Sequence, residues 1–313
     1  MPSAELEAVV AQLRAHPLNL SSSEQQLRTR LDGFAKMFSV PPGVEVATTR
    51  LGGISAEHVV ADAKGPVVLY LHGGGYVTGS PSSHRHVAAR IAKEASAQAY
   101  TLDYSLAPEA PFPAALDDVL AAYRALLVKH RDANIIFAGD SAGGGLVFAA
   151  AIAARAQGLP SPAALVGMSP WVNLGTESES FDKLVSVDPT LSREVVAYFS
   201  SRYLAGQSST DPRASPLFAD VTGLPPVLIQ VGDRECFFGD AVRMHQTLVS
   251  AGVDSELSVW KGMFHVWHLY WPILSEGREA IARIASFVAG HGRVQTVLVE
   301  KEEQWADYSL AKS

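Results

Sequence analysis

Apolar and polar positions follow two periods that alternate along most of this chain. Short apolar runs predict strands buried on both faces, and the alternating residues of 44–49 and 54–61 predict two antiparallel strands. Apolar residues three or four positions apart predict helices. The expected strands are Val44–Thr49, Ile54–Ala61, Pro66–Leu71, Gln98–Asp103, Ile135–Ala138, Ala163–Met168, Pro225–Val231 and Ser255–Trp260. The expected helices among and after them are Ser83–Ala95, the stretch ending near His130, Leu146–Ala156, Ala241–Ala251 and Ser275–Ala289. This alternation predicts an α/β fold with eight strands in a mostly parallel sheet, flanked by helices on both faces.

Two segments without strands interrupt this pattern. Residues 1–42 hold two amphipathic helices, Ala4–Ala15 and Ser23–Phe38, and residues 175–207 have helical periodicity only. We expect 1–42 and 175–207 to form a two-part helical cap over a core made of 43–174 and 208–290. The polar tail, 291–313, is expected to be a solvated extension or an oligomer contact.

Composition narrows the class of protein. A hydrophobic fraction of 48% is enough for a large core, and the formal net charge of −7 argues against a nucleic-acid partner. No apolar run reaches the roughly 18 residues of a membrane span, and the N-terminus lacks the pattern of a signal peptide. The single cysteine, Cys236, excludes an internal disulfide and fits a reducing compartment. We therefore expect a cytoplasmic protein with no membrane span, and a homodimer is a further expectation.

One strand–turn–helix passage carries a nucleophile motif. The strand Ile135–Ala138 leads into Gly139-Asp140-Ser141-Ala142-Gly143, which fits G-x-S-x-G and precedes an alanine-rich helix. Glycines on either side allow a sharp turn that lifts a serine hydroxyl above the sheet edge, close to the first N–H groups of the helix. The same letters also occur in ordinary strand-to-helix turns, so the motif needs partners elsewhere in the chain.

A second glycine-rich passage, His72-Gly73-Gly74-Gly75-Tyr76, follows the strand Pro66–Leu71. No Lys-Ser or Lys-Thr follows, which excludes a phosphate-binding loop, and the dinucleotide fingerprint is absent. Consecutive glycines after a strand are typical of the loop whose N–H groups stabilise a developing oxyanion in lipases and esterases. His72 is expected to hold this loop in place.

A serine nucleophile needs a base and an acid from loops that follow later strands. Among ten histidines, His265 lies in the loop after the last strand, and His268 is expected to start the next element. The acid should follow Pro225–Val231, where Asp233 and Glu235 are both candidates, and Asp240 is expected to cap the following helix. Spacing alone does not choose between Asp233 and Glu235.

Taken together, the motifs resemble those of the bacterial hormone-sensitive-lipase family of α/β-hydrolases, the family IV esterases. They are His72–Gly75, Asp103-Tyr104 with Leu106–Glu109, Pro111–Ala115, Gly139–Gly144, Ser169-Pro170-Trp171 and Gly262–His265. The resemblance implies an oxyanion hole from the N–H groups of Gly73, Gly74 and Ala142, and Glu235 as the acid with Asp233 in reserve. This chain departs from the family pattern in having glutamate at 235, Ser105 for a usual arginine and Val266 for a usual glycine.

These features predict a carboxylic-ester hydrolase that acts on short- to medium-chain esters through a Ser141–His265–acid acyl-enzyme mechanism, with no metal or cofactor. The same machinery could instead act on a lactone, a steroid or terpenoid ester, or an aryl formamide. A non-catalytic hormone-binding relative is a third possibility, and the presence of His265 counts against it. Aromatic residues expected to shape the substrate pocket are Phe34, Phe38, Tyr76, Trp171, Phe199, Tyr203 and Trp267.

Overall fold

The computed structural model describes residues 3–131, 133–177 and 179–292. Within those ranges the chain forms eight strands in one sheet, in the order β1-β2-β4-β3-β5-β6-β7-β8. Their bounds are β1 (Glu45–Leu51), β2 (Ile54–Val60), β3 (Val67–Leu71), β4 (Gln98–Leu102), β5 (Ile135–Asp140), β6 (Ala164–Met168), β7 (Val227–Gly232) and β8 (Ser255–Trp260). The hairpin β1–β2 and the pair β2–β4 are antiparallel, and the other neighbours are parallel. The predicted fold class is confirmed.

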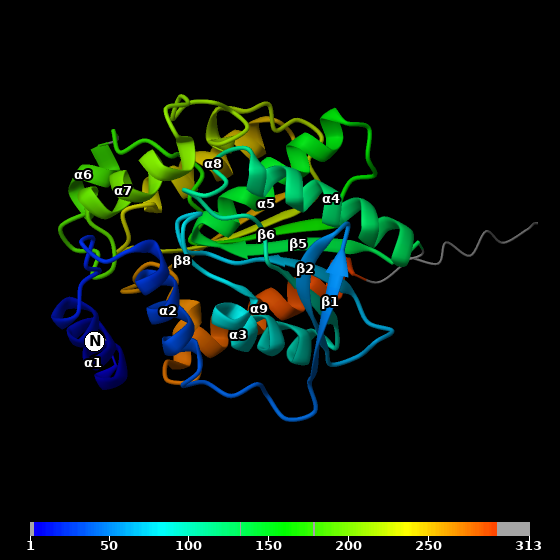
Figure 1. Cartoon of the computed structure of the whole chain (residues 1–313), viewed down its shortest axis with the longest axis horizontal. Coiled ribbons are helices and arrows are strands. Elements are labelled where there is room, and N and C mark those ends of the chain that lie inside the picture. The colour runs from blue at the N-terminus through cyan, green and yellow to red at the C-terminus, as the bar shows by residue number, and fades with distance from the viewer. Residues whose placement is uncertain (1–2, 132, 178, 293–313) are drawn as a thin grey trace, which may run out of the picture.

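Helices cover both faces of the sheet. Figure 1 shows α3 (Pro81–Ala95) and α9 (Ser275–His291) on one face, and α4 (Ala114–Lys129), α5 (Ser141–Ala156) and α8 (Phe238–Ser250) on the other. Every residue of β3, β5 and β6 is buried, because these central strands face a hydrophobic core on each side. This double burial explains their continuous apolar sequences.

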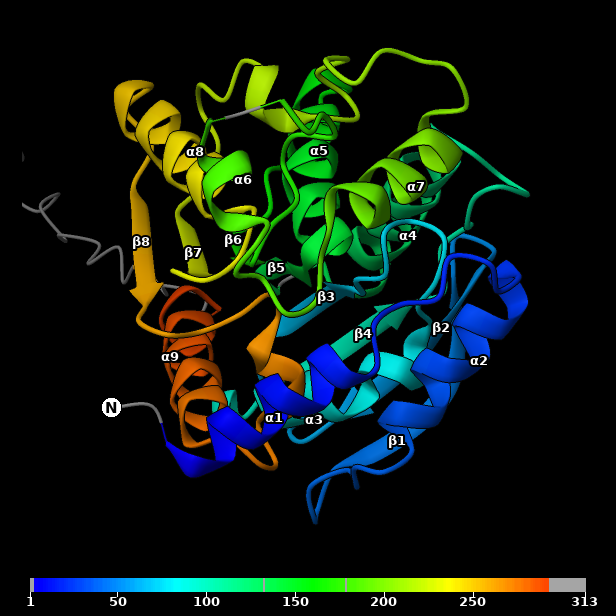
Figure 2. The same ribbon diagram turned by 90° about the vertical axis from the view of Figure 1, so that its left-hand side faces the viewer.

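Four helices lie outside these layers. They are α1 (Ala4–Ala15), α2 (Glu24–Ala35), α6 (Glu179–Leu184) and α7 (Arg193–Leu204), and they gather at one end of the sheet (Figures 1 and 2). Ser23 begins α2 with a capping box, and an ion pair of 2.8 Å between Glu24 and Arg202 joins α2 to α7. The two segments expected to form a cap therefore lie together.

Helix α5 begins five residues earlier than expected. Its first turns contain Gly143, Gly144 and Gly145, which are poor helix formers and led to the expectation of a start at Leu146. A Cβ on Gly143 would lie 2.0 Å from the carbonyl oxygen of Leu71, and a Cβ on Gly145 would lie 2.1 Å from that of Trp171. Close packing of the helix on its neighbours therefore requires these glycines and outweighs their low helix propensity.

The expected tail at 291–313 lies outside the described residues, apart from the end of α9 and Gly292. Two short 3-10 helices complete the elements, Pro216–Phe218 and Trp267–Tyr270. In the described part of the chain, none of the helices combines the length and the apolar character needed to cross a bilayer.

Candidate active site

Ser141 stands on the sharp turn between β5 and α5, with a left-handed backbone φ of 53°. Residues other than glycine rarely adopt this conformation. A Cβ on Gly139 would lie 2.6 Å from the carbonyl oxygen of Gly143, so the turn leaves no room for a side chain there. The glycines around Ser141 are therefore a steric requirement of the turn, and the serine lies on the wall of a cavity.

His265 connects this serine to a carboxylate. Its Nε2 lies 2.9 Å from Ser141 Oγ, and its Nδ1 lies 2.7 Å from Glu235 Oε2. A carboxylate only accepts, so Nδ1 carries a proton and Nε2 is free to accept one from the serine. Burial alone would lower the pKa of His265, but the hydrogen bond to Glu235 and its negative charge outweigh burial, and the pKa is raised.

Glu235 is fully buried and is held at both carboxylate oxygens. Oε2 accepts from His265, and Oε1 accepts from the backbone N–H of Gly232 at 2.7 Å and from the hydroxyl of Ser169 at 2.8 Å. The carboxylate therefore has a single orientation relative to the imidazole.

The other two carboxylates in this region do not contact His265. Asp233 Oδ1 accepts from the backbone N–H of Gly262 at 2.6 Å, so this side chain supports the base of the histidine loop. Asp240 is not the helix cap that we expected. It is the third residue of α8 and pairs with Asn173 and Arg243, each at 3.1 Å.

The oxyanion loop differs from expectation by one residue. The N–H of Gly73 donates to Asp140 Oδ1 at 3.1 Å, so that donor is occupied. Gly74 and Gly75 line the cavity beside Ser141, and their N–H groups have no acceptor among the described residues. Ala142 lies in the first turn of α5, where backbone N–H groups have no partner within the helix. The N–H groups of Gly74, Gly75 and Ala142 are therefore available as donors near Ser141, whereas the N–H of Gly73 is occupied by Asp140.

Buried polar groups hold the glycine-rich loop after β3 in place. Asp140 accepts from Tyr70 at 2.8 Å, from His84 at 3.2 Å and from Gly73. Burial alone would raise the pKa of Asp140, but these partners outweigh it and lower the pKa. Burial lowers the pKa of His72 to about 3, and the neutral ring bonds the Gly73 carbonyl oxygen at 2.8 Å, the holding role expected for it.

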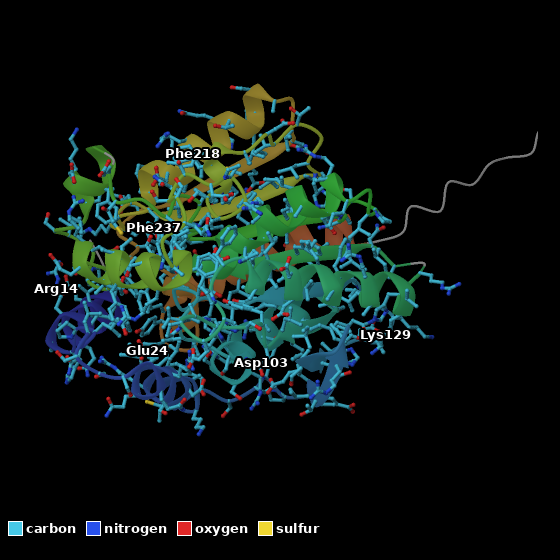
Figure 3. All side chains as sticks on the ribbon, turned by 45° about the horizontal axis from the view of Figure 1, so that its top comes forward. Arg14, Glu24, Asp103, Lys129, Phe218 and Phe237 are labelled. Atoms are coloured by element: carbon cyan, nitrogen blue, oxygen red, sulfur yellow. The ribbon has the colours of Figure 1, made fainter. Side chains whose placement is uncertain are left out.

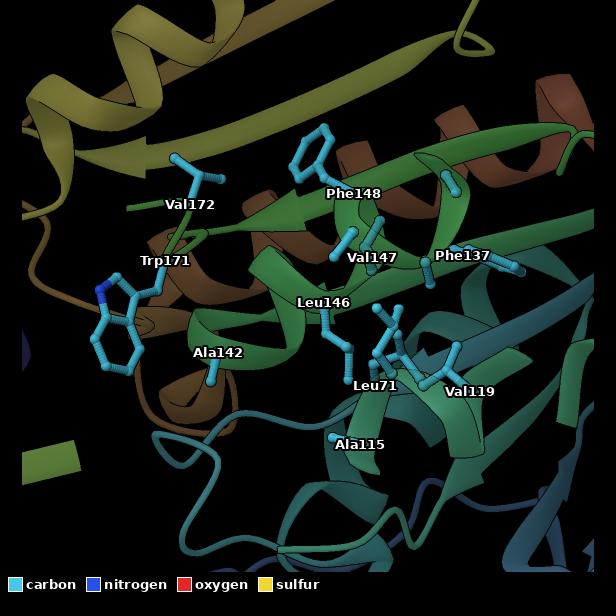
Figure 4. Close-up of a cluster of buried hydrophobic side chains, with 14 of the residues drawn as sticks. Leu71, Ala115, Val119, Phe137, Ala142, Leu146, Val147, Phe148, Trp171 and Val172 are labelled. Atoms are coloured by element: carbon cyan, nitrogen blue, oxygen red, sulfur yellow. The ribbon is translucent and has the colours of Figure 1, made fainter. Parts of the chain in front are cut away.

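The cavity above Ser141 has a volume of about 310 Å³ and is mostly apolar. Its walls come from the α1–α2 segment, from the α6–α7 segment and from the loops after β3 and β8. Figure 4 shows Ala142 and Trp171 near the start of α5, and Trp171 is one of the residues that line the cavity. A volume near 300 Å³ is at the lower end of the range for small-molecule sites.

Three of the seven aromatic residues expected at the pocket line the cavity: Phe34, Trp171 and Phe199. The other four do not line it, because each packs against a neighbour behind the wall. The ring centroid of Phe38 lies 5.1 Å from those of Phe34 and His86. The rings of Tyr76 and Tyr203 stack with their centroids 3.7 Å apart, and those of Trp267 and His268 pack with their centroids 3.9 Å apart.

Known proteins resemble this chain over most of its length. A family model described as alpha/beta hydrolase fold matches residues 68–269. An acetyl-hydrolase of Streptomyces hygroscopicus is 42% identical over 92% of this chain and 97% of its own, and an esterase of Acinetobacter venetianus is 34% identical over 87% and 90%. The crystal structure of an esterase from the bacterial hormone-sensitive lipase family has a TM-score of 0.89, with 40% identity over 93% of this chain and 99% of its own.

The chain belongs to the bacterial hormone-sensitive-lipase family of α/β-hydrolases. The resemblance inferred from the separated motifs is therefore confirmed. The predicted enzyme class, carboxylic-ester hydrolase, is the class of its named relatives.

Sequence reasoning missed several residues of this hydrolase site. Phe237 lines the cavity, lies edge-on to His265 at 5.1 Å and stacks on Trp171 at 5.6 Å. Leu191 and Val195 of the α6–α7 segment also line it. The apolar periodicity of 175–207 indicated a buried face for Val195, but no feature of the sequence showed that Phe237 would meet the histidine.

The segment that carries α6 and α7 is attached directly to the turn that carries Glu235. Asp188 Oδ2 accepts from the N–H of Cys236 at 3.0 Å, while its Oδ1 accepts from the N–H of Thr190 at 2.8 Å and from that of Leu191 at 3.1 Å. Helix α1 contacts the same segment, since Arg14 donates to the carbonyl oxygen of Val187 at 3.5 Å; Figure 3 shows Arg14 beside it. These hydrogen bonds therefore join the wall of the cavity to the turn that carries Glu235.

Proposed function

We propose that this hydrolase cleaves esters of short acyl chains through an acyl-enzyme formed on Ser141. The observation that carries the proposal is the hydrogen-bonded chain from Ser141 through His265 to Glu235, which opens into an apolar cavity. In this proposal His265 Nε2 takes the hydroxyl proton as Ser141 Oγ attacks the ester carbonyl carbon.

The negative oxygen of the tetrahedral intermediate accepts hydrogen bonds from the N–H groups of Gly74, Gly75 and Ala142. Each such donor contributes roughly 3 kcal/mol to the transition state. His265 then returns the proton to the leaving oxygen, the C–O bond breaks and the alcohol departs. Water then attacks the carbonyl carbon of the acyl group, with His265 as the base that takes its proton. The bond to Ser141 Oγ breaks, and the carboxylic acid and free Ser141 are released.

A covalent trap tests the nucleophile directly. A p-nitrophenyl alkylphosphonate should phosphonylate Ser141 once, with release of one p-nitrophenol, and the labelled peptide should be identified by mass spectrometry. A label on another serine, or no label in an enzyme that hydrolyses p-nitrophenyl butyrate, would exclude this mechanism.

The short-chain preference is supported by cavity size and by relatives. The cavity volume of about 310 Å³ suits a small acyl group, and one relative is named an acetyl-hydrolase. EstE5 is 38% identical to this chain with a TM-score of 0.88, and one of its crystals was soaked with p-nitrophenyl butyrate. Comparing the hydrolysis rates of p-nitrophenyl esters, lactones and aryl formamides shows which of these bonds the enzyme cleaves.

Cytoplasmic location, the division into core and cap, and a homodimer stay predictions.

Truncating a cavity wall should shift the acyl preference. Phe199 lines the cavity from α7, so Phe199→Ala should raise the ratio of kcat/KM for p-nitrophenyl octanoate to that for the butyrate by about tenfold. The ratio is the measurement because Phe199 also packs on Gly75, where a Cβ would lie 2.4 Å from the ring, and its loss can lower both rates. Phe38→Leu, outside the cavity, should leave the ratio unchanged. Equal ratios in both variants would contradict the assignment of the acyl site.

The raised pKa of His265 predicts the acid limb of the pH profile. The base must be neutral, and a raised pKa means that protonation removes activity at a higher pH than for an ordinary histidine. We expect kcat/KM for p-nitrophenyl butyrate to decrease as the pH is lowered, with the midpoint of the decrease above about pH 6.5. A midpoint below about 6 would show that Glu235 does not stabilise the charged imidazole.

A further inference from the structure

Three segments of the site meet at one buried hydroxyl. Ser169 follows β6 directly and has no exposed surface. Its Oγ donates to Glu235 Oε1 at 2.8 Å and accepts from the backbone N–H of Val266 at 3.1 Å. One side chain therefore contacts the proposed acid and the residue next to the proposed base.

Ser169 and Val266, which this hydrogen bond joins, both have a backbone conformation that is rare for residues other than glycine. Ser169 has a φ of 46° and Val266 a φ of 52°, and neither residue type adopts the left-handed region readily. Surrounding bonds hold the turn there. The N–H of Ser169 donates to Gln230 of β7 at 2.7 Å, and the N–H of Trp171 donates to the carbonyl oxygen of Ser141 at 2.8 Å.

A glutamate acid makes such support necessary. Its side chain has one more rotatable bond than an aspartate, so it samples more positions unless both oxygens are held. Gly232 and Ser169 together hold Oε1, which leaves Oε2 directed at His265 Nδ1. Without the hydroxyl, Oε1 keeps one donor and the Val266 N–H loses its acceptor.

We propose that Ser169 is a positioning residue for catalysis, whose hydroxyl sets the Glu235 carboxylate and the His265 loop in one geometry. This inference rests on the proposed function of Ser141, His265 and Glu235. Ser169 does not line the cavity, so it acts on the rate of the chemical step and not on substrate binding.

Removing the hydroxyl should lower kcat and leave KM nearly unchanged. Ser169→Ala should lower kcat for p-nitrophenyl butyrate about 10- to 100-fold, with KM within about twofold, because a small displacement of catalytic groups has effects of that order. Ser169→Gly also lacks the hydroxyl but accepts the left-handed backbone, so it should lose as much kcat without added strain. Ser169→Cys keeps a similar size and a weak S–H donor, and its kcat should lie between those of the alanine variant and the parent.

A double-mutant cycle separates positioning from general destabilisation. In a Glu235→Ala background there is no carboxylate to hold and only the contact with the Val266 N–H remains, so adding Ser169→Ala should lower kcat less than about threefold further. Additive losses would overturn the proposal, as would alanine and glycine variants with kcat within about twofold of the parent. If Ser169 variants keep full kcat while Ser141→Ala is inactive, only this inference fails; an active Ser141→Ala removes the proposed function itself.

Discussion

Replacing Ser141 by alanine should lower kcat for p-nitrophenyl butyrate by about 10⁵-fold or more. The substitution removes the one oxygen that His265 Nε2 contacts at 2.9 Å, so no acyl-enzyme can form. Residual hydrolysis should be limited to what the oxyanion donors and the cavity provide for attack by water. Initial rates, measured with enough enzyme to detect slow turnover, give the loss.

The fold should tolerate this change. Alanine removes a single oxygen and keeps the Cβ, so the strained turn at residue 141 and the packing of α5 are preserved. Ser201→Ala is a matched control, because Ser201 is an exposed serine of α7 whose hydroxyl donates to the carbonyl oxygen of Tyr198 in the same helix. We expect it to keep the parent rate. More than about 1% of parental activity in Ser141→Ala would mean that another group is the nucleophile.

The second large effect is expected at Glu235. Glu235→Gln should lower kcat by about 10³- to 10⁴-fold through the tautomer of His265. Because Gly232 and Ser169 both donate to Oε1, the glutamine oxygen should take that place and its NH₂ group should face Nδ1. Nδ1 then accepts, Nε2 carries the proton, and the imidazole cannot receive the serine proton.

Asp233→Asn is the matched control for this prediction. Asn keeps an oxygen that can accept from the Gly262 N–H, so kcat should stay within about fivefold of the parent. The pH profile gives an independent readout: without the Glu235 carboxylate the pKa of His265 falls, and the acid limb should move to lower pH only in Glu235→Gln. The opposite ranking of the two variants would make Asp233 the acid.

Residue patterns were sufficient for the fold and for two of the three residues of the proposed triad. Burial on both faces leaves a continuous apolar run in the central strands β3, β5 and β6, and the partly exposed hairpin β1–β2 shows an alternating pattern, so the strands could be located from the sequence. The carboxyl ends of such strands share one edge, which led to Ser141 and His265 from their places in the chain. The interruption at 175–207 likewise indicated helices outside the sheet.

Choices between neighbouring residues depended on the paths of the loops. Gly73 was expected as an oxyanion donor, but its N–H bonds Asp140, a residue 67 positions away in the chain. Spacing did not choose between Asp233 and Glu235, whose side chains diverge toward Gly262 and His265. Of seven aromatic residues expected at the pocket, four instead pack behind its wall, because an apolar residue has the same signature in a core and in a cavity.

The G-x-S-x-G turn shows which features follow from the sequence alone and which depend on the tertiary structure. The sequence by itself determined the strand, the helix and the glycines, because steric exclusion and burial act on each residue locally or through a short period. Only the tertiary structure decided what the serine meets. Hydrogen bonds reach about 3 Å and depend on direction, so Ser169 and Glu235 acquire their partners from segments that the chain brings together from residues far apart.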